Sequence, residues 1–127
     1  MTEKSIFPGL KPDGSWYLPD RLNMAGQALS HPAEELAIID LTGPERVDVS
    51  YGDLGEMVDG LARYLLTRIQ PGDRIGVLLG QSPWCAAAHL AIWKVGAISV
   101  PLFKLFKRDA LASRVGDAGV LFVFTDA

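Results

Sequence analysis

The chain has 127 residues, of which 49% are hydrophobic and 21% charged, a composition typical of one globular domain with a sizeable core. A net charge of −3 gives no electrostatic basis for binding nucleic acid or an anionic membrane. The single cysteine, Cys85, excludes an internal disulfide and favours a reducing, cytoplasmic compartment. The longest nearly apolar run, residues 84–100, is interrupted by polar residues and is too broken for the roughly 20 residues of a membrane span.

The first thirty residues predict little regular structure. Residues 1–20 contain three prolines and two glycines, which break helices and strands, so we expect an irregular arm. Trp16 and Tyr17 lie within it and are expected to pack on the body of the protein, because aromatic rings gain free energy on burial. Asp20 is a capping residue type and predicts a short helix over residues 21–30.

Residues 36–50 predict a two-stranded antiparallel ribbon. Two apolar or alternating runs, at residues 36–41 and 47–50, are joined by four turn-forming residues. Ser50 then begins the clearest helical pattern, with Asp53 placed to complete a capping box. The apolar residues that follow share the spacing of one buried helical face: Leu54, Met57, Val58, Leu61, Ala62, Leu65, Leu66 and Ile69.

From residue 75 onward the pattern changes to short apolar strands separated by helices. Strands are predicted at residues 75–79, 97–100 and 120–124, and helices from Ser82 to about residue 94 and at residues 108–118. Gly96 stands where the left-handed residue after a helix belongs, and Gly119 is expected to end the second helix. Leu111, Ala112 and Val115 are expected to be buried in the second of these helices. The fold class is therefore α/β, with a short β-ribbon and a three-stranded parallel βαβαβ sheet flanked by helices.

Several segments together resemble the amino-terminal part of AMP-forming acyl-CoA synthetases, members of the adenylate-forming superfamily. The order of the pieces carries the resemblance: Tyr-Gly-Asp-Leu at residues 51–54, Gly-Asp-Arg-Ile-Gly-Val-Leu-Leu at 72–79, Gln-Ser-Pro at 81–83 and Lys-Val-Gly-Ala-Ile-Ser-Val-Pro-Leu at 94–102, then Arg114 and Asp117. Acetyl-type or medium-chain relatives are the most similar. The resemblance implies an irregular arm at residues 1–20 and an amino-terminal α/β subdomain at residues 21–127.

Such enzymes, as the resemblance implies, join a carboxylic acid to ATP with loss of pyrophosphate and then transfer the acyl group to coenzyme A, with magnesium accompanying the nucleotide. This chemistry belongs to acetate and fatty acid metabolism. The family's Ser/Thr/Gly-rich phosphate loop, its adenine and ribose motifs and its catalytic lysine have no counterpart in these 127 residues. We therefore expect an amino-terminal fragment that is inert alone, with no catalytic residue and no bound cofactor. The alternatives are a non-catalytic oligomerisation module and a small CoA- or nucleotide-binding protein.

One segment is singled out as a site. It contains Phe103, Lys104, Lys107 and Arg108, follows a strand at the carboxyl edge of the sheet and leads into a helix, where backbone N–H groups and three cations can meet a phosphate. In acetyl-type relatives the matching segment contacts coenzyme A, so the resemblance implies a CoA contact here. The alternative is a solvated basic turn whose two phenylalanines, Phe103 and Phe106, pack inward. No metal site is expected, because neither histidine has enough companion ligands.

The last predicted strand, residues 120–124, lies at the edge of the sheet. Unpaired strand groups and apolar surface recruit other chains. We therefore expect a homo-oligomer that associates through the exposed sheet edge and apolar faces.

Overall fold

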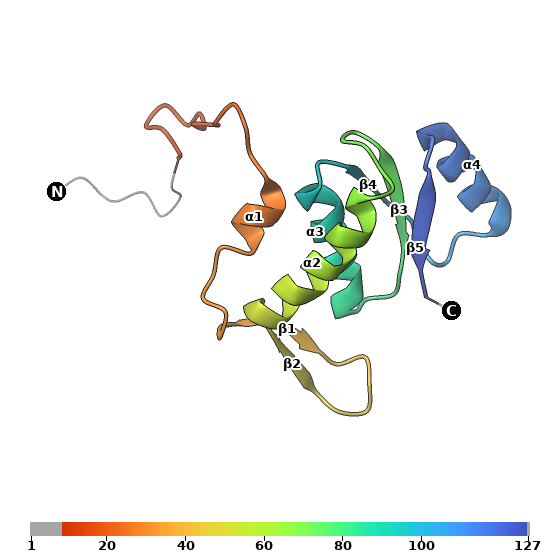
Figure 1. Ribbon diagram of the computed structural model, residues 1–127, viewed down its shortest axis with the longest axis horizontal. Helices are drawn as coiled ribbons and strands as arrows, with labels where there is room; N and C mark the ends of the chain where they lie inside the picture. Colours follow the sequence, from red (N-terminus) through yellow and green to blue (C-terminus); the bar gives the residue numbers. More distant parts are fainter. Residues whose placement is uncertain (1–8, 127) are drawn as a thin grey trace.

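The computed structural model describes residues 9–126. At its centre is a three-stranded parallel sheet with helices on both sides, and a separate two-stranded ribbon lies beside it (Figure 1). The elements in chain order are α1 (Met24–Ala28), β1 (Leu36–Asp40), β2 (Val47–Ser50), α2 (Tyr51–Leu66), β3 (Arg74–Leu78), α3 (Pro83–Lys94), β4 (Ile98–Pro101), α4 (Arg108–Ala118) and β5 (Phe122–Thr125). The predicted α/β fold is confirmed. Within residues 9–126, no helix has the length and apolar character needed to cross a bilayer.

The ribbon leads directly into α2 through Ser50. β1 and β2 pair antiparallel, with Asp40 opposite Val47. The Ser50 hydroxyl oxygen accepts a hydrogen bond from the Asp53 N–H at 3.1 Å, and the Asp53 carboxylate accepts one from the Ser50 N–H at 3.1 Å. These bonds form a capping box, and the hydrogen bonds from Ser50 lower the pKa of Asp53. The predicted ribbon and helix start are both confirmed.

β3 is the central strand of the parallel sheet. It pairs with β4 on one side and β5 on the other, both parallel. Ile75 and Val77 are buried in the main core, on the face covered by α2 and α3. Gly76 points to the opposite face, which α4 covers (Figure 1): a Cβ placed on it would lie 2.9 Å from Val123 Cγ2 and 3.1 Å from Leu102 Cδ1. Cover on both faces explains why β3 carries no polar side chain from Ile75 to Leu78.

The buried face of α2 follows the predicted helical spacing with one exception. Leu54, Val58, Ala62 and Leu65 are buried. Leu66 is 65% exposed, so its predicted burial is wrong. It follows Leu65 directly, and a step of one residue turns the side chain by about 100° around the helix, away from the core.

α4 has the bounds that the sequence predicts, but it is less buried than expected. Gly119 ends it in the left-handed conformation, with φ of +61°. No residue of α4 is fully buried: Leu111 and Val115 are partly exposed and Ala112 is exposed. The predicted burial of these three residues is therefore wrong. α4 lies over the sheet, and a cavity of about 560 Å³ with largely apolar walls remains between them.

α1 is shorter than the predicted helix and begins at a different cap. Asn23, not Asp20, is the N-cap, and its side-chain oxygen accepts a hydrogen bond from the Gly26 N–H at 3.2 Å. The Asn23 amide also donates to the Lys94 carbonyl oxygen at 3.1 Å, which ties α1 to the end of α3. A tertiary hydrogen bond of this kind leaves no signal in local sequence, and it favours Asn23 over the equally suitable Asp20.

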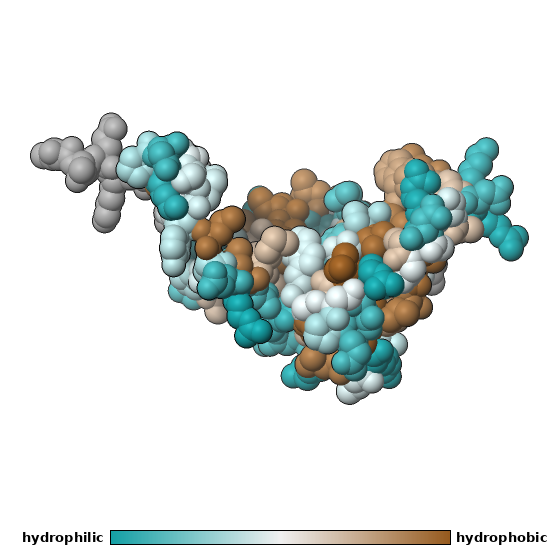
Figure 2. All heavy atoms as spheres, turned by 90° about the horizontal axis from the view of Figure 1, so that it is seen from above, coloured by the Kyte–Doolittle hydropathy of each residue, from teal (hydrophilic) through white to brown (hydrophobic). Residues whose placement is uncertain are grey.

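The described part of the arm lies away from the sheet (Figure 1). It forms its own turn, closed by an isolated bridge between Leu10 and Trp16. Trp16 is 53% exposed and Tyr17 is 69% exposed, so the predicted packing of these two rings on the body is wrong. Hydrophobic side chains are also exposed at several places on the body, as the brown patches of Figure 2 show.

Candidate functional site

The carboxyl ends of β3, β4 and β5 meet at one edge of the sheet, as parallel pairing requires. The connections that leave this edge are the segment from β3 to α3, the segment from β4 to α4, and Asp126 after β5. In open parallel sheets, ligands bind outside this edge. The edge is therefore the first place to look for a site.

A cavity of about 460 Å³ lies at this edge, and we name it the edge cavity. Its walls come from both connections and from two helices. The residues that carry its chemistry are Gly80, Gln81, Cys85, His89, Phe103, Lys104, Phe106 and Arg114. The sequence assigned Phe103 and Lys104 to a site, and the structure places both of them in this cavity.

Two aromatic rings and a guanidinium form one wall of the edge cavity. Phe103 and Phe106 meet edge to face with ring centroids 5.6 Å apart, and Arg114 stacks on the Phe106 ring at 4.0 Å. Phe103 is 57% exposed. Phe103 therefore does not pack inward, as the alternative interpretation expected. Its exposed ring remains open to a ligand.

Lys104 is bound to Asp126 across the mouth of the sheet. Its Nζ lies 2.7 Å and 2.8 Å from the two carboxylate oxygens. The Gly80 N–H donates to the same carboxylate. The hydrogen bond from Lys104 is the main cause that lowers the pKa of Asp126. Lys104 and the Gly80 N–H both donate to the Asp126 carboxylate. The donors at this end of the sheet therefore suit an anion.

The other two predicted site residues lie apart from the edge cavity. Lys107 is the N-cap of α4 and is exposed. Arg108 begins α4 and lines the cavity between α4 and the sheet. The structure therefore brings together Phe103 and Lys104 but separates Arg108 from them. Sequence reasoning missed Asp126 as a site residue, although its position directly after a parallel strand is a usable signal.

A polar cluster backs the edge cavity on the α3 side. The Trp93 indole N–H donates to the Ser99 hydroxyl oxygen at 3.1 Å, and His89 Nδ1 lies 3.1 Å from the same oxygen. Burial lowers the pKa of the His89 imidazole. Residues 9–126 contain no group of three or more His, Cys, Asp or Glu side chains that could hold a metal ion.

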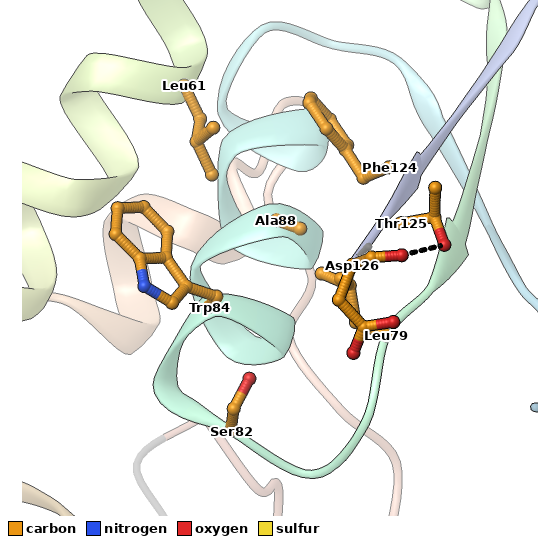
Figure 3. Close-up of a pocket in the computed structure, with 8 residues that line it drawn as sticks. All are labelled: Leu61, Leu79, Ser82, Trp84, Ala88, Phe124, Thr125 and Asp126. Atoms are coloured by element: carbon orange, nitrogen blue, oxygen red, sulfur yellow. Dashed lines mark hydrogen bonds between the residues drawn. The ribbon is translucent and has the colours of Figure 1, made fainter.

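A second, more apolar cavity of about 300 Å³ opens between α2, α3 and the end of β5 (Figure 3). Leu61 and Trp84 face each other across it, and Phe124 lies on the sheet side. Trp84 is 54% exposed. This cavity has apolar walls with Ser82 and Asp126 at its rim, so it lacks the cations of the edge cavity.

Comparison with known proteins adds the decisive observation. The sequence pattern of the family described as AMP-binding enzyme matches residues 24–127. The chain belongs to the AMP-binding enzyme family. Two similar relatives are acetyl-coenzyme A synthetase of Penicillium chrysogenum, 31% identical over 89% of this chain, and the human mitochondrial acetyl-coenzyme A synthetase 2-like protein, 32% identical over 87%. The chain spans 18% and 17% of these two relatives.

Solved structures agree on the fold of this member of the AMP-binding enzyme family. Apo MatB from Rhodopseudomonas palustris superposes with a TM-score of 0.72 and 23% identity, over 82% of this chain and 21% of MatB. The amino-terminal subdomain of Klebsiella oxytoca NpsA superposes with a TM-score of 0.60 and 24% identity, over 65% of this chain and 22% of that one. The fold of an adenylate-forming amino-terminal subdomain is therefore present.

Proposed function

We propose that this chain forms the amino-terminal portion of an AMP-forming acyl-CoA synthetase of the acetyl type. The family match over residues 24–127 is the observation that carries the proposal, and the relatives' names supply the acetyl class. In this proposal the complete enzyme converts a carboxylic acid, ATP and coenzyme A into acyl-CoA, AMP and pyrophosphate in the cytoplasm, with magnesium on the nucleotide.

The chain alone does not catalyse this reaction. The family's Ser/Thr/Gly-rich phosphate loop, adenine motif and catalytic lysine have no counterpart in these 127 residues. Calorimetry of the chain with ATP and magnesium is expected to give no binding tighter than about 10 μM, a free energy of roughly 7 kcal/mol. Pyrophosphate release from ATP in the presence of acetate would contradict this part of the proposal.

The role of the chain in the complete enzyme is to supply part of the coenzyme A site at the edge cavity. The exposed Phe103 ring, Lys104 and the two cations that follow support this assignment, because aromatic stacking and charge-assisted bonds suit a nucleotide that carries phosphates. Lys107 and Arg108 lie outside the cavity wall and act through longer-range attraction, which salt screens.

The experiment compares two triple variants that remove the same positive charge. K104A/K107A/R108A removes the three cations of the candidate site, and K11A/R21A/R63A removes three exposed cations elsewhere. In the complete enzyme at low salt, we expect the affinity for coenzyme A to fall about tenfold for the first variant. We expect it to change less than about twofold for the second variant. Equal affinities for both variants would leave only the solvated-turn interpretation.

Self-association is a second candidate function, favoured by the cavity beneath α4. Its apolar lining, which includes Leu78, Leu111, Val115 and Val123, lies next to the unpaired edge of β5. In this proposal the chain forms a homo-oligomer through these surfaces. Light scattering coupled to size exclusion, over a tenfold dilution series at micromolar concentration, is the test. A mass of one chain throughout would rule this candidate out.

A further inference from the structure

His89 is held by a hydrogen-bonded chain that links α3 to β4. An indole N–H can only donate, so the Ser99 oxygen accepts from Trp93 at 3.1 Å. The Ser99 hydroxyl proton is then free to donate to His89 Nδ1, 3.1 Å away. We assign Nδ1 as the acceptor, because this lets the Ser99 hydroxyl use its proton, and the imidazole proton then lies on Nε2.

The Nε2–H group is open to solvent. No described protein group bonds to Nε2, yet no buried side-chain nitrogen or oxygen in residues 9–126 lacks a partner. Nε2 must therefore be in contact with solvent. His89 lines the edge cavity and also a neighbouring cavity of about 520 Å³ beside β1, so it stands where the two meet.

We propose that His89 Nε2–H is a hydrogen-bond donor to a phosphate group of a ligand in the edge cavity, with Ser99 as the residue that positions it. The inference rests on the proposed function, in which this cavity takes part of coenzyme A. The segments on which the family resemblance was stated do not include His89. It is a binding residue for the ligand and takes no part in the chemical step.

The charges around His89 favour an anion there. Lys104 and Arg114 line the same cavity, from the β4–α4 connection and from α4. Two carboxylates are also near: Asp126 is paired with Lys104, and Asp40, on the β1 side, accepts from Thr42. Arg114, which forms no ion pair with a described residue, is therefore the cation that favours an anion in this cavity. The remaining titratable group is Cys85, one helical turn before His89 on α3.

Binding of a phosphate is expected to draw a proton onto His89. In the free chain, burial disfavours the imidazolium and lowers its pKa. A phosphate at Nε2 favours the charged form, so ligand affinity should rise as the pH falls. Upon protonation Nδ1 becomes a donor and turns to the Ser99 oxygen, whose hydroxyl proton must then find another acceptor.

The test is calorimetry with coenzyme A at pH 8 and at pH 6, with inorganic pyrophosphate as a second probe. His89→Gln keeps a donor near the Nε2 position but does not titrate, and His89→Met removes the donor. His31→Gln, at the chain's other histidine, is the matched control. Because the ligand's own phosphates titrate near pH 6, the argument uses the ratio of variant to wild-type affinity at each pH.

At pH 8 we expect His89→Gln to bind coenzyme A within about twofold of wild type and His89→Met to bind about tenfold more weakly. At pH 6 the wild type should bind about tenfold more tightly than His89→Gln. Ser99→Ala should weaken coenzyme A binding at pH 8. His31→Gln should have the same affinity as wild type at both pH values. Circular dichroism of each variant confirms that it folds.

Each other outcome decides against a specific claim. If coenzyme A binds and the affinities of the His89 variants equal that of wild type at both pH values, this inference is wrong and the proposed function stands. If pyrophosphate alone shows the dependence on His89, the site binds free phosphates and the coenzyme A assignment is wrong. If neither probe binds the wild-type chain, this inference is wrong, whereas the proposed function, in which the chain supplies only part of the coenzyme A site, is not contradicted.

Discussion

Gly76 offers a sharp test of how β3 packs against β5 and against the segments that follow β4 and precede β5. An alanine Cβ at this position would lie 2.9 Å from Val123 Cγ2, 3.1 Å from Leu102 Cδ1 and 3.4 Å from Val120 Cγ1. Contact with three neighbours at once leaves little room for any of them to shift. Overpacking of a buried site costs about 1–3 kcal/mol, so we expect Gly76→Ala to lower the free energy of unfolding by that amount.

The same chemical change at Gly60 is the control and should have the opposite sign. Gly60 is exposed in the middle of α2, and a Cβ there meets no atom within 4 Å. Alanine in a helix interior is more favourable than glycine by about 0.5–1 kcal/mol, so Gly60→Ala should stabilise the chain. Urea unfolding followed by circular dichroism measures both. Equal or greater stability for Gly76→Ala would refute the described packing of Val123, Leu102 and Val120 around Gly76.

Further outcomes follow from the helix starts, from the pair between Lys104 and Asp126 and from the burial of His89. Ser50→Ala should lower the free energy of unfolding by about 1 kcal/mol. Ser82→Ala, at a helix start where the hydroxyl makes no capping bond, should change it little in the same urea assay. Asp126→Asn should alter stability by less than about 0.5 kcal/mol in urea, because its pair with Lys104 is exposed, and an unfolding effect several times larger would contradict that view. His89 should make the chain less stable as the pH falls through the ordinary histidine pKa: burial lowers its folded pKa, so the unfolded chain binds the proton more readily. Thermal melts of wild type and His89→Gln between pH 5 and 8 would show no difference in slope if this reasoning is wrong.

Sequence patterns predicted helix starts and ends well where these depend on interactions between neighbouring residues. The capping box at Ser50 and the left-handed glycines Gly96 and Gly119 depend on neighbouring residues only, and all three are confirmed. The short helix α1 shows the opposite case. Its N-cap is Asn23 rather than Asp20, and Asn23 is tied to α3 by a hydrogen bond across 71 residues of sequence. No local pattern records such a contact.

The candidate site was predictable in part for the same reason. The carboxyl edge of a parallel sheet follows from topology, so the sequence placed Phe103 and Lys104 correctly at that edge. It could not show that Asp126 pairs with Lys104 or that Arg114 stacks on Phe106, because both contacts depend on how β5 and α4 are placed in space. His89 was considered only as a metal ligand, since its bond to Ser99 becomes visible only when α3 and β4 lie side by side.

The central claim is that this chain is the amino-terminal portion of an AMP-forming acyl-CoA synthetase. The most direct measurement is pyrophosphate release by a chimera in which residues 24–127 replace the matching segment of the Penicillium chrysogenum acetyl-coenzyme A synthetase. A second chimera, with the matching segment of the human mitochondrial relative at the same junctions, is the control. The account predicts release that requires both ATP and a carboxylic acid, with acyl-CoA formed when coenzyme A is added. A folded but inactive chimera beside an active control would contradict it.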